Sequence, residues 1–462
     1  NYNFSSGSRG KGNLSSEANP YFLFPQIYNF RYNIFSSEWP VANRAIELYL
    51  QKKSENEGWE RQINGLSNNE KANLLLEKHT FKELLADVEQ RNLQNNIVGL
   101  EASRLFARSE INMGVDAFRD SLYAMLKRNT FLNIKFENML DTLGEMSRTD
   151  LYSYLKEWEQ LTPLPFYSIG EPELTKVVNK GGEEFFVLKV LVSNNSDYDG
   201  IIQMNVLQNG WWYQPMEDPR ARKKVEIAAH TSKEFVSVWE EQIRDVEINT
   251  MVSGNLPYMI RQSIGNVKQE RNKIVKDTIY TLPESSLEMP GEVIVDNEDS
   301  TLFVLSTPAV VGLLPKWLDK VEDTSFKYSG ISWWRAPLQW TATTNAKYYG
   351  KYIRSAYVIK SGDGSQTATW KIPVPEAGQY ELYYHVFKDD ELRWNDRLQG
   401  EYHFRVAYDS EMEDAYINLR KANEGWEQLG TYYFSADTVR VVLTDECKLR
   451  SVTADAVKIV KR

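Results

Sequence analysis

The stretch Thr162-Pro163-Leu164-Pro165 divides the chain into two parts with different hydrophobic periodicities. Proline lacks the amide hydrogen that a helix interior needs, so this pair of prolines ends any helix that reaches it. Before the stretch, apolar residues recur at helical spacing; after it, they alternate with period two. We therefore predict a multidomain α + β protein with an N-terminal helical domain, an immunoglobulin-like antiparallel β-sandwich and a C-terminal jelly-roll-like β-sandwich.

The helical pattern is clearest just before the two prolines. Four apolar residues fall at i, i+3, i+4 and i+7 and so share one helix face: Phe136, Met139, Leu140 and Leu143. Asn133 can cap this helix, and Ser147 followed by Asp150 resembles a capping box for a next helix that buries Trp158. The same spacing predicts earlier helices over residues 41–52, 69–90, 97–111 and 116–128.

After the prolines, short runs of β-branched and aromatic residues predict strands. Runs at 184–193 and 201–208 flank a polar hairpin connection, and three further runs complete a small sandwich. Residues 255–290 are polar and contain prolines, which predicts a solvated connector. From Gly291 a second set of alternating strands begins, interrupted by a short helix over residues 316–321.

These patterns give the predicted domain boundaries. The helical domain covers 1–162, the first sandwich 163–254, the connector 255–290 and the last sandwich 291–462. A chain of 462 residues is too long for one core and suggests about three domains at roughly 150 residues each. The polar start at Asn1 is typical of the interior of a longer polypeptide.

Composition excludes several classes of function. The net charge of −10 argues against nucleic-acid binding, because phosphate contacts need a basic face. Cys447 is the single cysteine, which excludes an intramolecular disulfide and cysteine-based metal clusters. No run approaches the ~18 apolar residues that span a bilayer, so we predict no transmembrane segment in this chain.

No catalytic motif is complete. The four histidines are His79, His230, His385 and His403, and no two have the spacing of a helical zinc site. His385 and His403 fall in candidate neighbouring strands, where two independent histidines are a better interpretation than a metal site. Phosphate-binding loops and nucleophile elbows are missing. We predict no catalytic residue, no metal and no cofactor.

Acidic runs and aromatic residues are the remaining candidates. The runs at 389–391 and 411–414 are typical of solvated loops, and Asp197 with Asp199 is typical of a turn. Five aromatic residues precede the alternating strands of the last domain: Trp333, Trp334, Trp340, Tyr348 and Tyr349. Their rings could stack on a sugar or a peptide, and core packing explains them equally well.

The last domain resembles a known family. The segments Tyr349-Gly350, Ala368-Thr369-Trp370, 374–380, 425–434 and Ala454-Asp455-Ala456-Val457 are similar to the golvesin C-terminal-like domain, which also occurs beside xanthan lyases. The resemblance covers residues 345–460. It implies a jelly-roll-like sandwich on an exported bacterial protein, located in the periplasm or on the cell surface. It also implies an accessory or binding role.

The helical part has a second, more limited resemblance. Residues 114–122, 133–143 and 147–158 are similar to the helices that follow the metal site of aminopeptidase-N-like zinc peptidases (gluzincins). In that register the zinc ligands would be Ser15, Asn19 and Glu38, and Ser16 would replace the catalytic glutamate. Serine and asparagine cannot hold zinc as imidazoles do, and a serine cannot act as a carboxylate base. The resemblance therefore implies no working zinc site.

Three functional hypotheses follow. The favoured one is a non-catalytic C-terminal part, or degenerate homologue, of an exported bacterial metallopeptidase-like protein that acts as a binding or scaffolding module. Its partner would be a glycan, a protein, or upstream domains of the same polypeptide. The alternative is a fragment of an active zinc aminopeptidase whose metal-binding segment lies upstream. The third is an accessory domain of a carbohydrate-active enzyme.

Overall fold

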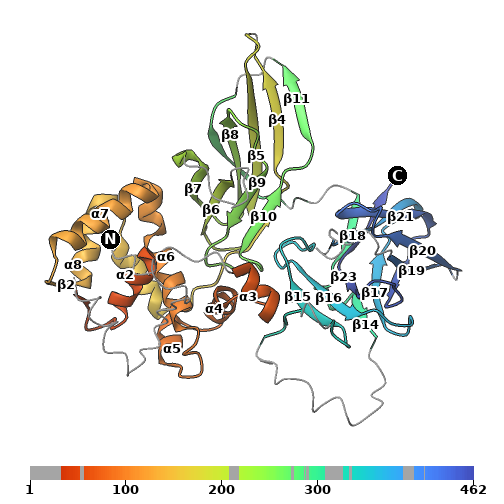
Figure 1. The fold of residues 1–462 in the computed structure, drawn as a ribbon, viewed down its shortest axis with the longest axis horizontal. Coiled ribbons are helices and arrows are strands. Elements are labelled where there is room, and N and C mark those ends of the chain that lie inside the picture. Colours follow the sequence, from red (N-terminus) through yellow and green to blue (C-terminus); the bar gives the residue numbers. More distant parts are fainter. Residues whose placement is uncertain are drawn as a thin grey trace. The chain divides into compact units, whose positions relative to one another are not determined.

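The computed structural model describes residues 33–51, 57–179, 181–207, 218–271, 275–285, 287, 291–306, 326–331, 336–388, 400–409 and 411–462. A region of eight α-helices comes first in this part of the chain, and several mainly antiparallel β-sheets follow (Figure 1). The predicted α + β class is confirmed. In the described residues, every helix is too short or too polar to cross a membrane. Two compact units are present, one with residues 72–163 and one with residues 227–462, and each is described separately.

The helices have the following bounds: α2 Ala42–Leu50, α3 Glu57–Asn64, α4 Asn68–Leu76, α5 Phe81–Ala86, α6 Gln94–Met113, α7 Val115–Arg128, α8 Phe136–Ser147 and α9 Leu151–Lys156. The predicted helix over 69–90 is wrong, because the side chain of Thr80 accepts from the amide of Glu83 and caps a separate helix, α5. Ser147 ends α8, and Asp150 alone caps α9 by accepting from the amide of Ser153.

A cluster of aromatic rings forms part of the core of the helical region. Trp158, in the 3-10 turn Glu157–Glu159, is buried as predicted. Its ring centroid lies 4.6 Å from that of Phe81, 5.2 Å from that of Trp39 and 6.4 Å from that of Phe136. Asn133 does not cap α8. It lies in the short strand β2 (Asn133–Lys135), which pairs in parallel with β1 (Asn33–Phe35).

Ten strands follow the helical region in the described residues: β3 Tyr167–Ile169, β4 Glu173–Val178, β5 Glu184–Asn194, β6 Gly200–Leu207, β7 Arg222–Ile227, β8 Thr231–Trp239, β9 Asp245–Asn249, β10 Met259–Ser263, β11 Val267–Arg271 and β12 Thr278–Pro283. They form two sheets, ordered β10-β9-β6-β7 and β11-β4-β5-β8-β12, with β3 on β5. The expected hairpin at 194–200 is wrong, because β5 and β6 belong to different sheets and this segment crosses between them.

The segment 255–290 contains three strands, although its sequence predicts a connector. β10 pairs with β9, β12 pairs with β8, and β11 pairs with β4 in parallel. All three lie at sheet edges, and β11 and β12 are mostly exposed. An edge strand with exposed faces needs few apolar residues, so its sequence lacks the alternation that identifies a buried strand. The domain boundaries themselves stay predictions.

The C-terminal part has twelve strands where the structure describes it: β13 Glu292–Val295, β14 Phe303–Leu305, β15 Thr341–Thr344, β16 Ser355–Lys360, β17 Thr367–Pro373, β18 Gly378–Val386, β19 Glu401–Tyr408, β20 Glu411–Asn418, β21 Gly425–Phe434, β22 Thr438–Thr444, β23 Ser451–Ala454 and β24 Val457–Lys461. The sheets β13-β24-β18-β21 and β14-β17-β22-β19-β20 enclose a core that includes Trp370, Tyr384 and Phe404, as in a sandwich. β15, β16 and β23 form a third sheet. The predicted helix at 316–321 lies outside the described residues.

One extra residue interrupts the pairing of β21 with β18. Leu382 pairs with Gly430 and Tyr383 pairs with Gln428, so Leu429 has no partner residue in β18. A bulge of this kind changes which side chains of a strand face the core. Phe434 is buried at one end of β21, whereas Trp426 at the other end lies opposite His385, on the outer face of the sheet.

Candidate functional site

The candidate site forms around Asp455, which lies between β23 and β24 and is fully buried. Its carboxylate accepts from the amide of Tyr349 at 3.2 Å and from Nδ1 of His385 at 2.8 Å. Its backbone carbonyl accepts from Nε1 of Trp370 at 3.2 Å. Burial raises the pKa of Asp455, and the adjacent His385 partly opposes that shift. Asp455 thus links the loop that contains Tyr349 to His385 in β18 and to the core residue Trp370 in β17.

Tyr349 lies in the loop between β15 and β16, and hydrogen bonds fix this loop. The Tyr348 amide donates to the carbonyl of Asn345 at 3.1 Å, and Nη1 of Arg354 donates to the carbonyl of Ala346 at 2.8 Å. Burial lowers the pKa of Arg354 to about 10. The tyrosine is therefore held in place before any ligand arrives.

Three rings meet on the outer face of β18 and β21. The Trp426 ring centroid lies 5.0 Å from that of Tyr349 and 5.1 Å from that of His385, and the other two centroids are 5.8 Å apart. Nζ of Lys458 lies 4.8 Å from the Trp426 centroid and forms an ion pair with Glu292 at 2.9 Å. The face thus combines aromatic surface with charged groups, which is the composition of many small-molecule sites.

A cavity of about 190 Å³ opens beside Tyr349. It is lined by Glu292, Ile294, Asp296, Tyr349 and Lys351. Burial raises the pKa of Asp296 well above its usual range, and the charges of Asp455 and Glu298 raise it further.

The aromatic residues expected to bind a ligand lie in different surroundings. Tyr349 lines the cavity, Tyr348 is buried, and Trp340 packs against the core. Trp333 and Trp334 lie outside the described residues. Sequence reasoning did not select Trp426, His385 or Asp455 as site residues. The segments around Trp426 and Asp455 were part of the family resemblance, and that was the signal that could have identified them.

Glu38, the one described residue of the proposed degenerate zinc site, is exposed in the loop before α2. Ser15, Ser16 and Asn19 lie outside the described residues. Within the ranges that the structure describes, no three His, Cys, Asp or Glu side chains are placed to hold a metal ion.

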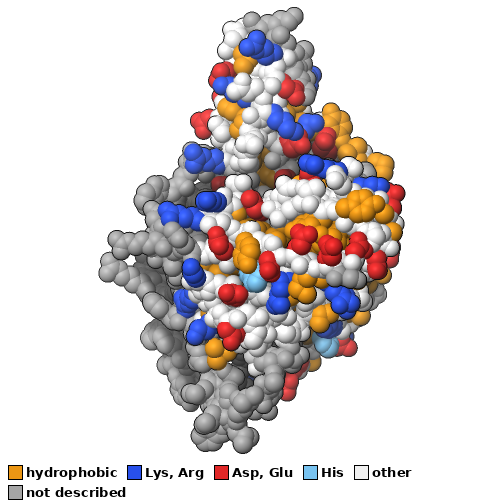
Figure 2. Space-filling model, turned by 90° about the vertical axis from the view of Figure 1, so that its right-hand side faces the viewer, with side chains coloured by type: hydrophobic (Ala, Val, Ile, Leu, Met, Phe, Trp, Pro, Cys, Tyr) orange, Lys and Arg blue, Asp and Glu red, His pale blue; other side chains and the backbone are white. Residues whose placement is uncertain are grey.

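His385 and His403 do not meet across a sheet, because β18 and β19 belong to different sheets. His403 stacks on Tyr416 at 4.8 Å between ring centroids, and its Nε2 donates to Asp414 at 2.8 Å. The acidic run 411–414, expected as a loop, forms the exposed edge strand β20. Figure 2 shows the side at the right of Figure 1, where acidic side chains form a row among hydrophobic ones. The run 389–391 lies outside the described residues.

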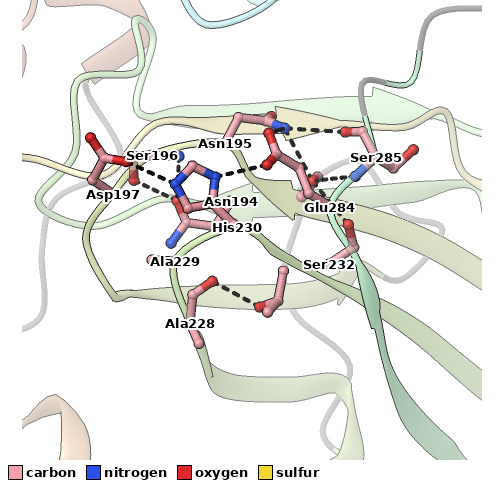
Figure 3. Close-up of polar contacts among 12 residues, drawn as sticks. Asn194, Asn195, Ser196, Asp197, Ala228, Ala229, His230, Ser232, Glu284 and Ser285 are labelled. Carbon is pink, nitrogen blue, oxygen red and sulfur yellow. Dashed lines mark hydrogen bonds and ion pairs between the residues drawn. The ribbon is translucent and has the colours of Figure 1, made fainter.

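His230 lies in the turn between β7 and β8, between two carboxylates (Figure 3). Nε2 bonds to Asp197 at 2.8 Å and Nδ1 bonds to Glu284 at 2.8 Å. Only the protonated ring can donate from both nitrogens. Asp199 accepts from the amide of Ala229 at 2.9 Å, so its carboxylate holds the turn that contains His230.

This geometry predicts a pH-dependent contribution to stability. The hydrogen bonds to Asp197 and Glu284 raise the pKa of His230, so the stabilisation is complete below about pH 6.5 and is lost as the pH rises through the raised pKa. We expect the melting temperature of the wild type to exceed that of His230→Ala at mildly acidic pH and the difference to shrink at alkaline pH. Thermal melts between about pH 5 and about pH 9 test this. His79→Ala, an exposed histidine of the helical region, is the control. Parallel wild-type and His230→Ala curves would contradict the prediction.

Comparison with known proteins identifies the C-terminal part. Residues 334–461 match the Golvesin C-terminal domain. This confirms the first resemblance, and the match contains all three rings of the candidate site. No curated protein matches the chain.

Two of the solved structures that match this chain are distant from it. One is β-glucuronidase 2 of Bacteroides uniformis, covalently bound to cyclophellitol-6-carboxylate aziridine, with 11% identity, a TM-score of 0.19, and coverage of 68% of this chain and 31% of that one. Another is the Sulfolobus turreted icosahedral virus, with 10% identity, a TM-score of 0.14, and coverage of 64% and 92%. The chain thus spans about a third of the glucuronidase. TM-scores this low do not establish a shared fold, and nothing among these matches supports the aminopeptidase resemblance.

Proposed function

We propose that the Golvesin C-terminal domain of this chain is a non-catalytic glycan-binding module of a protein that works outside the cytoplasm. Its binding surface is the outer face of β13-β24-β18-β21 around Trp426. The observation that carries the proposal is the contact of Trp426, Tyr349 and His385 beside a cavity lined by carboxyl groups and Lys351.

The chemistry of this surface suits a saccharide. The C–H groups of a sugar ring pack against aromatic rings, and its hydroxyls need nearby donors and acceptors. Glu292, Asp296 and Lys351 provide such groups at the cavity. The contacts of Asp455 fix the His385 ring and the backbone of Tyr349. A surface fixed in this way loses little entropy when it binds a ligand.

The same geometry argues against Asp455 as a catalytic residue. Glycoside hydrolases use two carboxyl groups that both reach the scissile bond. Asp455 is fully buried and already bonded to His385 and Tyr349, so it cannot reach a substrate. Glu292 is paired with Lys458.

The role of the helical region as a scaffold is part of the same proposal.

Trp426→Ala tests the proposed surface. Loss of the central ring is expected to weaken glycan binding by roughly tenfold or more, which is about 1.4 kcal/mol. A glycan array identifies ligands of the wild type, and calorimetry then measures the affinity of the wild type and of Trp426→Ala for them.

Tyr433→Ala is the matched control, because Tyr433 is an exposed aromatic residue at the far end of the same strand. It should retain wild-type affinity. If wild type and Trp426→Ala bind equally, or if the wild type binds no glycan, the proposal is wrong.

A further inference from the structure

The carboxyl groups around the cavity differ in their partners. Glu292 is paired with Lys458 at 2.9 Å, and Glu298 with Lys327 at 2.5 Å. Oδ1 of Asp296 accepts from the amide of Asn297 at 2.7 Å. Among the described residues, Asp296 forms no ion pair, although it lines the cavity.

The surroundings of Asp296 favour a positive charge in the cavity. The carboxyl group is half-buried, and the negative charges of Asp455 and Glu298 oppose its ionisation. A cation beside Asp296 would compensate for all of these effects at once. Lys351 also lines the cavity and is exposed.

The size and lining of the cavity restrict the kind of cation. A volume of about 190 Å³ holds a small group, since each water molecule of the liquid takes about 30 Å³. The Tyr349 ring in its wall favours a cation that can lie against an aromatic face. A hard metal ion would need six or more oxygen ligands, and no such group of side chains is present in the described part of the chain. An ammonium group meets these conditions.

We propose that this cavity receives the protonated amine of an amino sugar beside Asp296. The inference rests on the proposed glycan-binding function and specifies its ligand: a saccharide with a free, unacetylated amine. An N-acetylated sugar has no charge to offer, and its acetyl group would occupy the space that the ammonium needs.

Binding would then be linked to proton release. A cation beside Asp296 favours the ionised carboxylate and so lowers its raised pKa; the carboxyl group passes to the buffer whatever proton it carries at the pH of the assay, and the sugar keeps its own. Calorimetry in two buffers with different ionisation enthalpies measures the number of protons released.

The test compares glucosamine oligomers with N-acetylglucosamine oligomers of the same length. We expect the wild type to bind the free-amine form at least about tenfold more tightly, with release of protons to the buffer. Asp296→Asn should abolish both the preference and the proton release. This variant should fold, because a neutral amide suits surroundings that favour the uncharged carboxyl group, and it keeps the oxygen that accepts from Asn297.

Asp437→Asn is the control, because it removes the same charge from an exposed turn of the same domain. It should keep the preference for the free-amine oligomers. That result would show that the preference comes from the cavity and not from the general attraction between ammonium groups and a chain with net charge −10. If both kinds of oligomer bind equally, or if Asp296→Asn keeps the preference, this inference is wrong while the glycan-binding function stands. If the wild type binds neither the oligomers nor any glycan of the array, both are wrong.

Discussion

Replacing Asp455 by alanine is expected to lower the free energy of unfolding of the Golvesin C-terminal domain by roughly 2–5 kcal/mol. The residue is fully buried, and the amide of Tyr349 and Nδ1 of His385 both donate to its carboxylate. Alanine would leave both donors without an acceptor, and a buried unsatisfied donor costs far more than a hydrogen bond exposed to water. It would also release the Tyr349 loop from the strand.

Urea denaturation of wild type and variant measures this change. The free energy of unfolding of Asp455→Asn should lie between those of the wild type and Asp455→Ala, because the amide oxygen still accepts from the amide of Tyr349. Asp437→Ala, in an exposed turn, should stay within about 0.5 kcal/mol of the wild type. A loss below about 1 kcal/mol for Asp455→Ala would show that the carboxylate does not hold the site together.

Replacing Trp158 by alanine should destabilise the helical region by about 3–5 kcal/mol. The indole is buried and contacts the rings of Trp39, Phe81 and Phe136, which come from three separate segments. Its removal leaves a large cavity that the surrounding helices can fill only in part.

Urea denaturation, monitored by the far-UV circular dichroism signal of the helices, measures this destabilisation. Tyr152→Ala on α9 is the control, because Tyr152 is 40% exposed and its removal creates no cavity. If Trp158→Ala unfolds at the same urea concentration as the wild type, the ring cluster is not the centre of this core.

The sequence predicted those elements whose apolar residues face one core. Helix α8 was predicted from its apolar face, and Trp158 was correctly predicted to be buried. The sequence does not predict the edge strands β11 and β12, because exposed strands carry no apolar alternation. The break at Thr80 was missed because a single capping residue overrode a continuous helical pattern.

The candidate site was only partly predictable, because its parts are far apart in the sequence. Tyr349 belongs to a local group of aromatic residues, and that grouping makes it a candidate from the sequence alone. Its partner Asp455 is 106 positions away, and His385 is 70 positions from Asp455. No local pattern indicates such contacts; pairing of strands across the sheets creates them. The family resemblance included the relevant segments without indicating that they meet.

The unpaired Leu429 has a consequence for comparing this domain with its relatives. In β21 the side chains before and after Leu429 follow opposite alternations, so Trp426 faces outward only because one residue is inserted between it and Phe434. A relative that lacks this residue would turn an aligned tryptophan into its core, although the motif would look intact. Spacing within the motif, rather than the tryptophan itself, therefore indicates which relatives share the outward-facing ring.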